Sequence, residues 1–304
     1  MNKACFFFKL SDITRDLPRN YKRYPDVTRV KNFVYDDRYG KYTTADLFFV
    51  EGKDKYPVVV NVHGGGFVKG GKKYRRAICS EYAREGYFVY NIDYRLAPQY
   101  ALPAAIEDVV TALNRLPELA EKYRLDLNTV VLTGDSAGGF YSLAGTIAAL
   151  DPDFRALLGA PEVKVTPKAF MGFCGAYRLG DLLTKKAPLN MTVDIADALF
   201  GVKTHGDAEY MESLDNNVFT DLVRFVKEGF PKTFLLYSKS DSFCDGQGEI
   251  LSEKLKRIGT DVTEYVATGK KDSHCFHLFP FHKTTPAVMS AAKDFLRSLR
   301  VEQE

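Results

Sequence analysis

The sequence predicts a three-layer α/β domain with a mostly parallel β-sheet, and two observations lead to this fold class. Continuous apolar runs recur along the chain, as expected of strands that are buried on both faces. Helical segments lie between these runs, and the alternation favours βαβ units whose helices cover the sheet. The runs are "VVVNV" (58–62), "FVYNI" (88–92), "TVVLT" (129–133), "AFMGFCG" (169–175) and "TFLLYS" (233–238).

The remaining strands are predicted near the two ends of this series. "TRVKNFVYD" and "TADLFFV" alternate apolar and polar residues, which is typical of half-buried antiparallel strands, and "RYGK" lies between them as a turn. "EYVA" (264–267) has the composition of a final strand. The chain is therefore expected to begin with antiparallel strands and to continue with parallel ones.

Four segments are predicted to form helices between or after the strands. Two of them, "RRAICSEYAREG" and "EILSEKLKRIG", end at the glycines Gly86 and Gly259, as helices often do. "AAIEDVVTALNRLPELAEKY" has apolar residues at helical spacing, and "PAVMSAAKDFLRSLR" closes the domain.

Two segments, residues 1–25 and 178–230, do not fit the alternation of strands and helices. The first contains aromatic and charged residues without a strand pattern, and the second contains one possible short helix, "DIADALF". In α/β enzymes such segments usually form a lid over the strand ends, where ligands bind. The alternative is a peripheral decoration without contact to the site.

Composition limits the class of protein. The 304 residues contain no repeats or flexible linkers, so we predict a single domain over residues 1–304. The net charge is +3 and the basic clusters are short, which predicts solvated faces and no nucleic-acid partner. No run is long enough to span a membrane, and the five scattered cysteines indicate neither a disulfide framework nor a zinc site. We therefore expect a cytoplasmic location.

The most informative stretch is "NTVVLTGDSAGGFYSLAGTIAAL", in which a strand leads through Gly134–Gly138 into a helix. This is the G-x-S-x-G elbow in the context that its chemistry requires. Ser136 must occupy an unfavourable backbone turn to expose its hydroxyl, so the residues two positions away on each side must lack side chains. The sequence thus predicts Ser136 as a nucleophile.

A serine hydroxyl needs a base, and the base needs a carboxylate to orient it. With this elbow the chain order is Ser, Asp or Glu, then His. His274 follows the last predicted strand and is favoured as the base over His277. Otherwise His277 and His282 are expected to be partly buried loop histidines that are satisfied by hydrogen bonds to the backbone. Asp241 ends the strand "TFLLYSKSD" and is favoured as the acid over Asp245. His205 lies in the 178–230 segment and precedes any suitable acid.

"HGGGFVKGGKK" (63–73) allows two interpretations. Gly66, Gly71 and Lys72 nearly match a phosphate-binding loop, but that loop needs Ser or Thr where this chain has Lys73. Consecutive glycines before an acyl-transfer site instead let backbone amides approach a developing oxyanion. We predict the oxyanion donors to be the amides of Gly65, Gly66 and Ala137. His63 and Gly64 are expected to support the turn, leaving Lys72 in an exposed basic tail.

Four motifs together resemble the hormone-sensitive-lipase-like family of α/β-hydrolase carboxylesterases. They are "HGGGF" (63–67), "DYRLAP" (93–98), "GDSAGG" (134–139), and "YSKSD" (237–241) paired with "HCF" (274–276). The resemblance implies an α/β-hydrolase fold with an eight-stranded sheet and a helical cap, here residues 1–25 and 178–230. It also implies a lipase-like serine esterase that acts on small-molecule esters through Ser136, Asp241 and His274, without cofactor or metal.

The chain departs from the family at two places. Cys275 stands where the family usually has Gly after the histidine, and "DSFCDG" replaces the common "DPLRDE" after the acid. In "DYRLAP", Asp93 and Arg95 are expected to be structural.

Several points stay open at this stage. Phe67, Tyr177 and Phe276 are candidates for the walls of an apolar substrate pocket, or they belong to the core. The same triad also serves amidases, carbohydrate deacetylases and feruloyl esterases. The plant gibberellin receptors of this family bind without cleaving, but they lack the histidine that this chain has at His274. The protein is expected to be a monomer or a homodimer.

Overall fold

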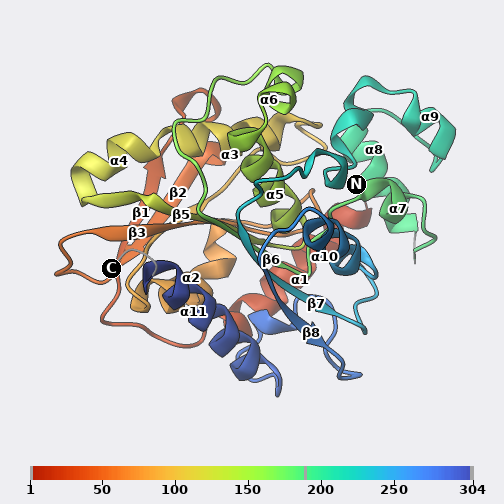
Figure 1. Ribbon diagram of the computed structural model, residues 1–304. Coiled ribbons are helices and arrows are strands. Elements are labelled where there is room, and N and C mark those ends of the chain that lie inside the picture. Colours follow the sequence, from red (N-terminus) through yellow and green to blue (C-terminus); the bar gives the residue numbers. More distant parts are fainter. Residues whose placement is uncertain (1–2, 188–189, 302–304) are drawn as a thin grey trace.

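The computed structural model describes residues 3–187 and 190–301, and in these residues the eight predicted strands form one sheet (Figure 1). The strand order is β1-β2-β4-β3-β5-β6-β7-β8. The pairs β1–β2 and β2–β4 are antiparallel, and the other pairs are parallel, which confirms the predicted mostly parallel sheet. The strands are β1 Thr28–Val34, β2 Thr44–Phe49, β3 Tyr56–Val62, β4 Phe88–Ile92, β5 Leu125–Asp135, β6 Ala169–Phe173, β7 Lys232–Ser238 and β8 Val262–Ala267.

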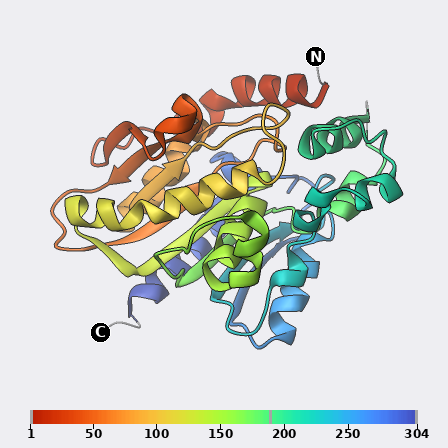
Figure 2. The same cartoon turned by 90° about the horizontal axis from the view of Figure 1, so that it is seen from above.

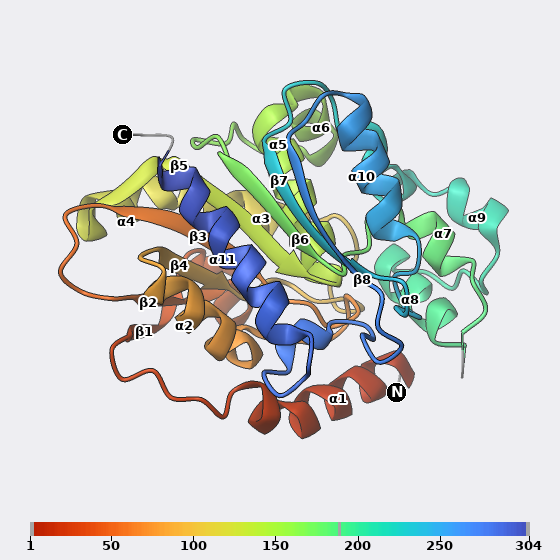
Figure 3. The same cartoon turned by 60° about the horizontal axis from the view of Figure 1, so that its bottom comes forward.

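Helices cover both faces of the sheet, giving the three layers (Figure 3). Because side chains of a strand alternate between faces, neighbouring residues enter different cores. Val59 and Val131 pack with the helices of one face, whereas Val58 and Val60 pack with those of the other. The first face carries α2 Arg76–Arg84 and α11 Thr285–Val301, and the second carries α3 Ala104–Asn114, α5 Ala137–Leu150 and α10 Gln247–Arg257.

The segment 104–123, predicted as one helix, forms two. α3 ends at Asn114, and α4 Leu116–Tyr123 begins with Pro117 in its first turn. Proline has no backbone N–H and disfavours a helical conformation in the residue before it, so it starts a new helix. The expected "RYGK" turn is a 3₁₀ segment, Asp37–Thr43, and the short helix α6 Pro152–Leu158 follows α5.

The two segments that interrupt the alternation contain helices that meet each other. Residues 1–25 contain α1 Lys3–Arg19, and the predicted helix "DIADALF" lies within α8 Met191–Phe200. The backbone N–H groups of Lys3 and Ala4 donate to the carboxylate of Asp194, at 2.6 and 3.2 Å. Two short helices, α7 Leu179–Leu183 and α9 Ala208–Glu212, flank α8 (Figure 2). We infer from this contact that the segments form one cap.

Two further properties concern the described residues as a whole. None of their helices is both long enough and apolar enough to cross a membrane. All five cysteines lie in the described residues, where they are buried and form no disulfide.

Candidate active site

Ser136 lies at the sharp turn between β5 and α5. Its backbone has φ 53° and ψ −122°, a conformation that non-glycine residues rarely adopt. A Cβ built at Gly134 would lie 2.3 Å from the Gly138 carbonyl oxygen, and one built at Gly138 would lie 2.0 Å from the Val62 carbonyl oxygen. The turn therefore excludes side chains at both glycines, for the steric reason that the sequence predicted.

Hydrogen bonds join the three predicted triad side chains. Nδ1 of His274 lies 2.8 Å from Oδ2 of Asp241, and Nε2 lies 2.8 Å from Oγ of Ser136. An ionised carboxylate only accepts hydrogen bonds, so Nδ1 carries the proton and Nε2 is free to accept from the serine hydroxyl. The residues come from three separate loops at the carboxyl ends of β5, β7 and β8.

The electrostatic environment shifts the pKa values of Asp241 and His274 in opposite directions. Burial opposes ionisation of Asp241, but His274 and the backbone N–H groups of Phe243 and Cys244 lower the pKa of its carboxyl below the usual value. Burial likewise opposes a charge on His274, whereas neighbouring Cys275 and Asp241 raise the pKa of the imidazole well above 6.5. Asp241 is therefore ionised at neutral pH, and a proton taken up by His274 is stabilised.

The other candidate histidines lie elsewhere. His282 Nε2 hydrogen-bonds the carbonyl of Lys271 at 3.0 Å, as expected of a loop histidine satisfied by backbone. The same expectation is wrong for His277, which stacks on Phe173 and has no hydrogen-bond partner for either ring nitrogen in the described part of the chain. His205 lies in the loop between α8 and α9, and the alternative acid Asp245 lies two residues before α10.

The glycine turn after β3 lies against the serine elbow and α1. Gly65 and Gly66 have φ 147° and 59°, and Gly65 lines the small cavity beside Ser136. A Cβ at Gly66 would lie 2.1 Å from the ring of Phe8 in α1, so glycine lets this helix approach the turn. Ala137 is the first residue of α5, with its amide directly after the nucleophile position. The role of these three amides as oxyanion donors stays a prediction.

His63 and Gly64 pack under the turn. His63 is buried, stacks on Tyr94 with ring centroids 4.4 Å apart, and contacts the Gly64 carbonyl through Nδ1 at 2.9 Å. Burial lowers the pKa of this imidazole, so it stays neutral. A Cβ at Gly64 would lie 2.4 Å from Oδ2 of Asp135, which explains the glycine at this position.

The end of the glycine motif differs from the expectation of an exposed basic tail. Lys72 is buried, and its Nζ contacts Asp93 at 2.5 Å and Thr44 at 2.6 Å. The backbone N–H of Lys72 also donates to Asp93, at 2.6 Å. A lysine is buried at low cost only when it is paired, and Asp93 supplies the partner. Lys72 thus ties β4 to the glycine loop, in keeping with the structural role expected for Asp93.

A buried ion pair that no sequence pattern predicted supports the serine elbow from within. Arg75 Nε and Nη2 contact the two carboxylate oxygens of Asp135, both at 2.6 Å, and both residues are buried. The expectation that residues 72–76 form a solvated face is therefore wrong for Arg75. The only hint in the sequence is Asp135, an acid at the first variable position of the G-x-S-x-G motif, directly before Ser136.

The predicted wall residues belong to the core. Phe67, Tyr177 and Phe276 are only 6%, 1% and 1% exposed. None of them is among the residues that line the cavity of about 120 Å³ beside Ser136. Phe67, for example, packs edge-on against Phe140, because the glycine turn directs it inward.

The apolar wall of the cavity beside Ser136 is formed instead by residues from α1 and from the loop after Asp241. Phe7, Phe8 and Phe243 line the cavity, and the ring of Phe243 lies 5.2 Å from that of His274. Phe7 and Phe243 also contact each other, with ring centroids 6.5 Å apart. The apolar wall therefore depends on α1, which could not be placed from the sequence.

Both departures from the family pattern fall beside the triad. Cys275 has φ 54°, the left-handed conformation that favours the glycine found there in the family. In "DSFCDG", the amides of Phe243 and Cys244 both donate to Oδ1 of Asp241 at 2.9 Å. The altered loop thus still orients the acid.

One group of side chains has the donor types of a metal site. Donor atoms of Asp241, Cys244 and His274 lie within 4.8 Å of one another. The Asp241 oxygens already accept from His274 and two amides, and burial raises the pKa of the Cys244 thiol, so it stays protonated. The three side chains therefore fit a Ser-His-Asp hydrogen-bond relay better than they fit the ligand set of a metal ion.

The eight-stranded sheet, the elbow after β5 and the linked Ser, His and Asp define an α/β hydrolase. The BD-FAE family matches residues 46–255, more than half of the chain. The protein belongs to this family, which is a hormone-sensitive-lipase-like family of α/β hydrolases.

Relatives and solved structures agree with this assignment. Esterase LipI of Mycobacterium tuberculosis is 35% identical over 152 residues, which are 49% of this chain and 45% of LipI. An esterase of Gibberella moniliformis is 28% identical over 78% of this chain and 74% of its own length. The crystal structure of C6-C4 SN3 inhibited esterase B from Lactobacillus rhamnosis aligns with a TM-score of 0.83 at 22% identity, covering 98% of this chain and 96% of that one.

Proposed function

We propose that the protein is a serine carboxylesterase that hydrolyses small to medium acyl esters. The observation that carries the proposal is the unbroken hydrogen-bond relay from Ser136 through His274 to Asp241. The relatives named above are esterases, and the esterase B structure carries a C6-C4 SN3 inhibitor. The small cavity beside Ser136 and its phenylalanine wall support an apolar acyl group of limited length.

The proposed reaction is an acyl transfer in two halves. His274 takes the Ser136 proton as Oγ attacks the ester carbonyl carbon, and the carbonyl oxygen becomes an oxyanion. The amides of Gly65, Gly66 and Ala137 donate to this oxyanion. His274 then gives the proton to the leaving alcohol, and an acyl-enzyme ester remains on Ser136.

Water completes the cycle. His274 accepts a proton from a water molecule as its oxygen attacks the acyl carbon, and a second oxyanion forms in the same place. When it collapses, Ser136 Oγ leaves with the proton from His274, and the carboxylic acid is released. Asp241 stabilises the imidazolium in both halves and stays ionised, as its lowered pKa favours.

The test is hydrolysis of 4-nitrophenyl esters of graded chain length. Ser136→Ala and His274→Asn are expected to lower kcat by roughly three orders of magnitude or more, whereas KM changes little. His205→Asn is the matched control, because His205 lies in the loop after α8 with φ 55°, which asparagine tolerates. Full activity of Ser136→Ala would refute the proposal.

Anilides, acetylated xylan and feruloyl esters in the same assay separate the amidase, deacetylase and feruloyl esterase alternatives.

A further inference from the structure

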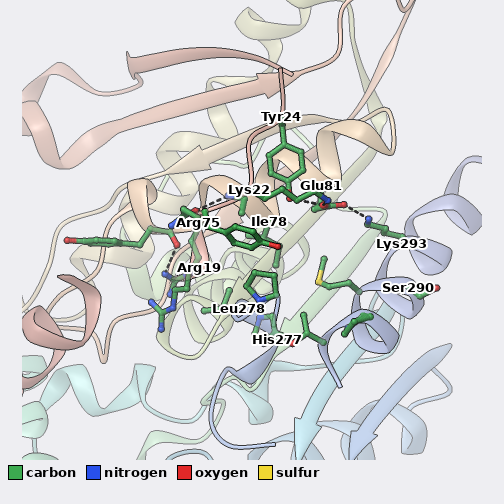
Figure 4. A pocket seen from close by; sticks show the side chains of 18 of the residues that line it. Arg19, Lys22, Tyr24, Arg75, Ile78, Glu81, His277, Leu278, Ser290 and Lys293 are labelled. Atoms are coloured by element: carbon green, nitrogen blue, oxygen red, sulfur yellow. Dashed lines mark hydrogen bonds and ion pairs between the residues drawn. The ribbon is translucent and has the colours of Figure 1, made fainter. Parts of the chain in front are cut away.

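A second cavity of about 550 Å³ lies at the C-terminal end of α1, next to the small cavity at Ser136. It is bounded by the end of α1, by α2 and by the start of α11 (Figure 4). The two cavities share Arg19 and Arg75 as lining residues, so these arginines separate them. The volume lies within the range of small-molecule sites, about 300–1,000 Å³.

Polar groups at one end of this cavity lack partners. Arg19 is 7% exposed, and its Nε and Nη1 have no hydrogen-bond partner in the described residues. Its nearest acid is Asp12, 3.6 Å from Nη1, on the side of the Ser136 cavity. Burial and the neighbouring Arg75 lower the pKa of Arg19 to about 10, and Asp135 and Asp12 oppose this shift, so the guanidinium stays charged at neutral pH.

His277 adds a second unpartnered group to the same lining. It is 3% exposed, and neither ring nitrogen has a partner among the described residues. Burial lowers the pKa of the imidazole to about 3, so the ring is neutral and one nitrogen carries a hydrogen. Buried polar groups are nearly always hydrogen-bonded, so a bound molecule that accepts from both Arg19 and His277 would satisfy this part of the lining.

The other charged groups of the lining form ion pairs, some of them with residues outside the cavity. Glu81 is held by Lys22 and Lys293, which lower the pKa of its carboxyl to about 2 despite burial (Figure 4). Arg75 is paired with Asp135, and Arg297 with Glu85. Among the described residues of this lining, Arg19 is thus the buried cation whose Nε and Nη1 have no hydrogen-bond partner.

The remaining walls are largely apolar. Ile78 and Leu278 lie between Arg19 at one end and Lys293 at the other (Figure 4), and Met289 and Pro286 complete this surface. A compact polyanion would leave these walls exposed to water, whereas a carboxylate with an apolar body would cover them.

We propose that this cavity binds a monocarboxylate with an apolar body, with the carboxylate held by Arg19 and His277. An arginine forms charge-assisted hydrogen bonds to a carboxylate, and the neutral imidazole adds a donor. Ester hydrolysis releases molecules of this class, so the acid product is the natural occupant. That identification rests on the proposed function, whereas the anion site rests on Arg19 and His277.

The test measures binding of hexanoate to the full chain by isothermal titration calorimetry, with hexanamide and inorganic phosphate as comparison probes. We expect hexanoate to bind at least tenfold more tightly than either probe. Arg19→Gln should weaken hexanoate binding by about ten- to a hundredfold. Ser290→Trp, which fills the cavity from α11 without lining the Ser136 cavity, should also weaken it. Thermal unfolding checks that both variants fold.

Arg84→Gln is the matched charge control, because Arg84 is paired with Asp26 and does not line the cavity. Its hexanoate affinity should stay within twofold of the parent. Equal binding of hexanoate and hexanamide, phosphate binding as tight as that of hexanoate, or unchanged affinity in Arg19→Gln and Ser290→Trp would each overturn the proposal. Binding is measured without turnover, so absence of esterase activity would refute the proposed function and leave this result intact.

Discussion

Arg75 and Asp135 form a buried two-point ion pair immediately before the serine elbow, with Nε–Oδ1 and Nη2–Oδ2 distances of 2.6 Å. Asp135 precedes Ser136 in the chain, and its carboxylate also packs against the position of a Cβ at Gly64. The pair therefore joins the start of α2, the elbow and the glycine turn. Three segments beside Ser136 therefore meet at this pair.

Breaking this pair is expected to destabilise the protein strongly. Arg75→Met leaves the Asp135 carboxylate buried without a counter-charge, which costs about 3–5 kcal/mol in the free energy of unfolding. Asp135→Asn should cost a similar amount, whereas the double variant should cost less than the sum of the two. Urea unfolding of the four proteins measures these values. Additive effects would show that the two side chains do not act as a pair.

The pH dependence of catalysis should reflect the raised pKa of His274. The base must be neutral to accept the Ser136 proton, so kcat/KM should fall as the pH falls through a midpoint above 6.5. The pH–rate profile of 4-nitrophenyl butyrate hydrolysis gives this midpoint, and His282→Asn should leave it unchanged. A midpoint below 6.5 would contradict the direction of the shift.

The same shift predicts a change in stability with pH. Because the folded pKa of His274 exceeds the unfolded value of about 6.5, its contribution is fully present below that pH. The contribution is lost as the pH rises through the folded pKa. Urea unfolding of wild type and His274→Gln should therefore differ more at pH 5.5 than at pH 9. An equal difference at both values would show that His274 titrates alike in both states.

Phe243 and Phe67 are predicted to have opposite mutant phenotypes. Phe243→Ala removes part of the wall beside His274, so it should raise KM for butyrate and hexanoate esters several-fold with little loss of stability. Phe67→Ala removes a buried ring from the core and should cost about 3–5 kcal/mol in unfolding free energy. Chain-length profiles and urea unfolding separate the two effects. A large KM change in a stable Phe67→Ala variant would restore Phe67 as a wall residue.

The left-handed conformation of Cys275 gives a test of the loop beside the base. Cys275→Gly relieves the conformational cost and should retain activity within about threefold, because glycine adopts this φ without strain. Cys275→Val is the contrasting variant, since a β-branched side chain is strongly disfavoured there, and both stability and kcat should fall. Equal behaviour of the two variants would show that backbone strain at this position does not matter.

Much of this protein follows from local sequence patterns. Buried strands appear as apolar runs, and the elbow requires small residues two positions on either side of Ser136. The order of elements then predicts that Asp241 and His274 follow strands whose carboxyl ends share one edge of the sheet. The structure joins these side chains by hydrogen bonds, and their catalytic role is the prediction that the kinetic tests address.

The tertiary structure decided what depends on contacts between distant segments. Arg75 and Asp135 are 60 residues apart, and Asp194 meets the start of α1 across 191 residues, so no local pattern pairs them. Phe67 follows the glycine motif but packs in the core. The packing of α1 brings Phe7 and Phe8 to the cavity, where they meet Phe243 from the loop after Asp241. Local sterics and strand order thus determined the placement of Ser136, Asp241 and His274, and long-range packing determined the walls around them.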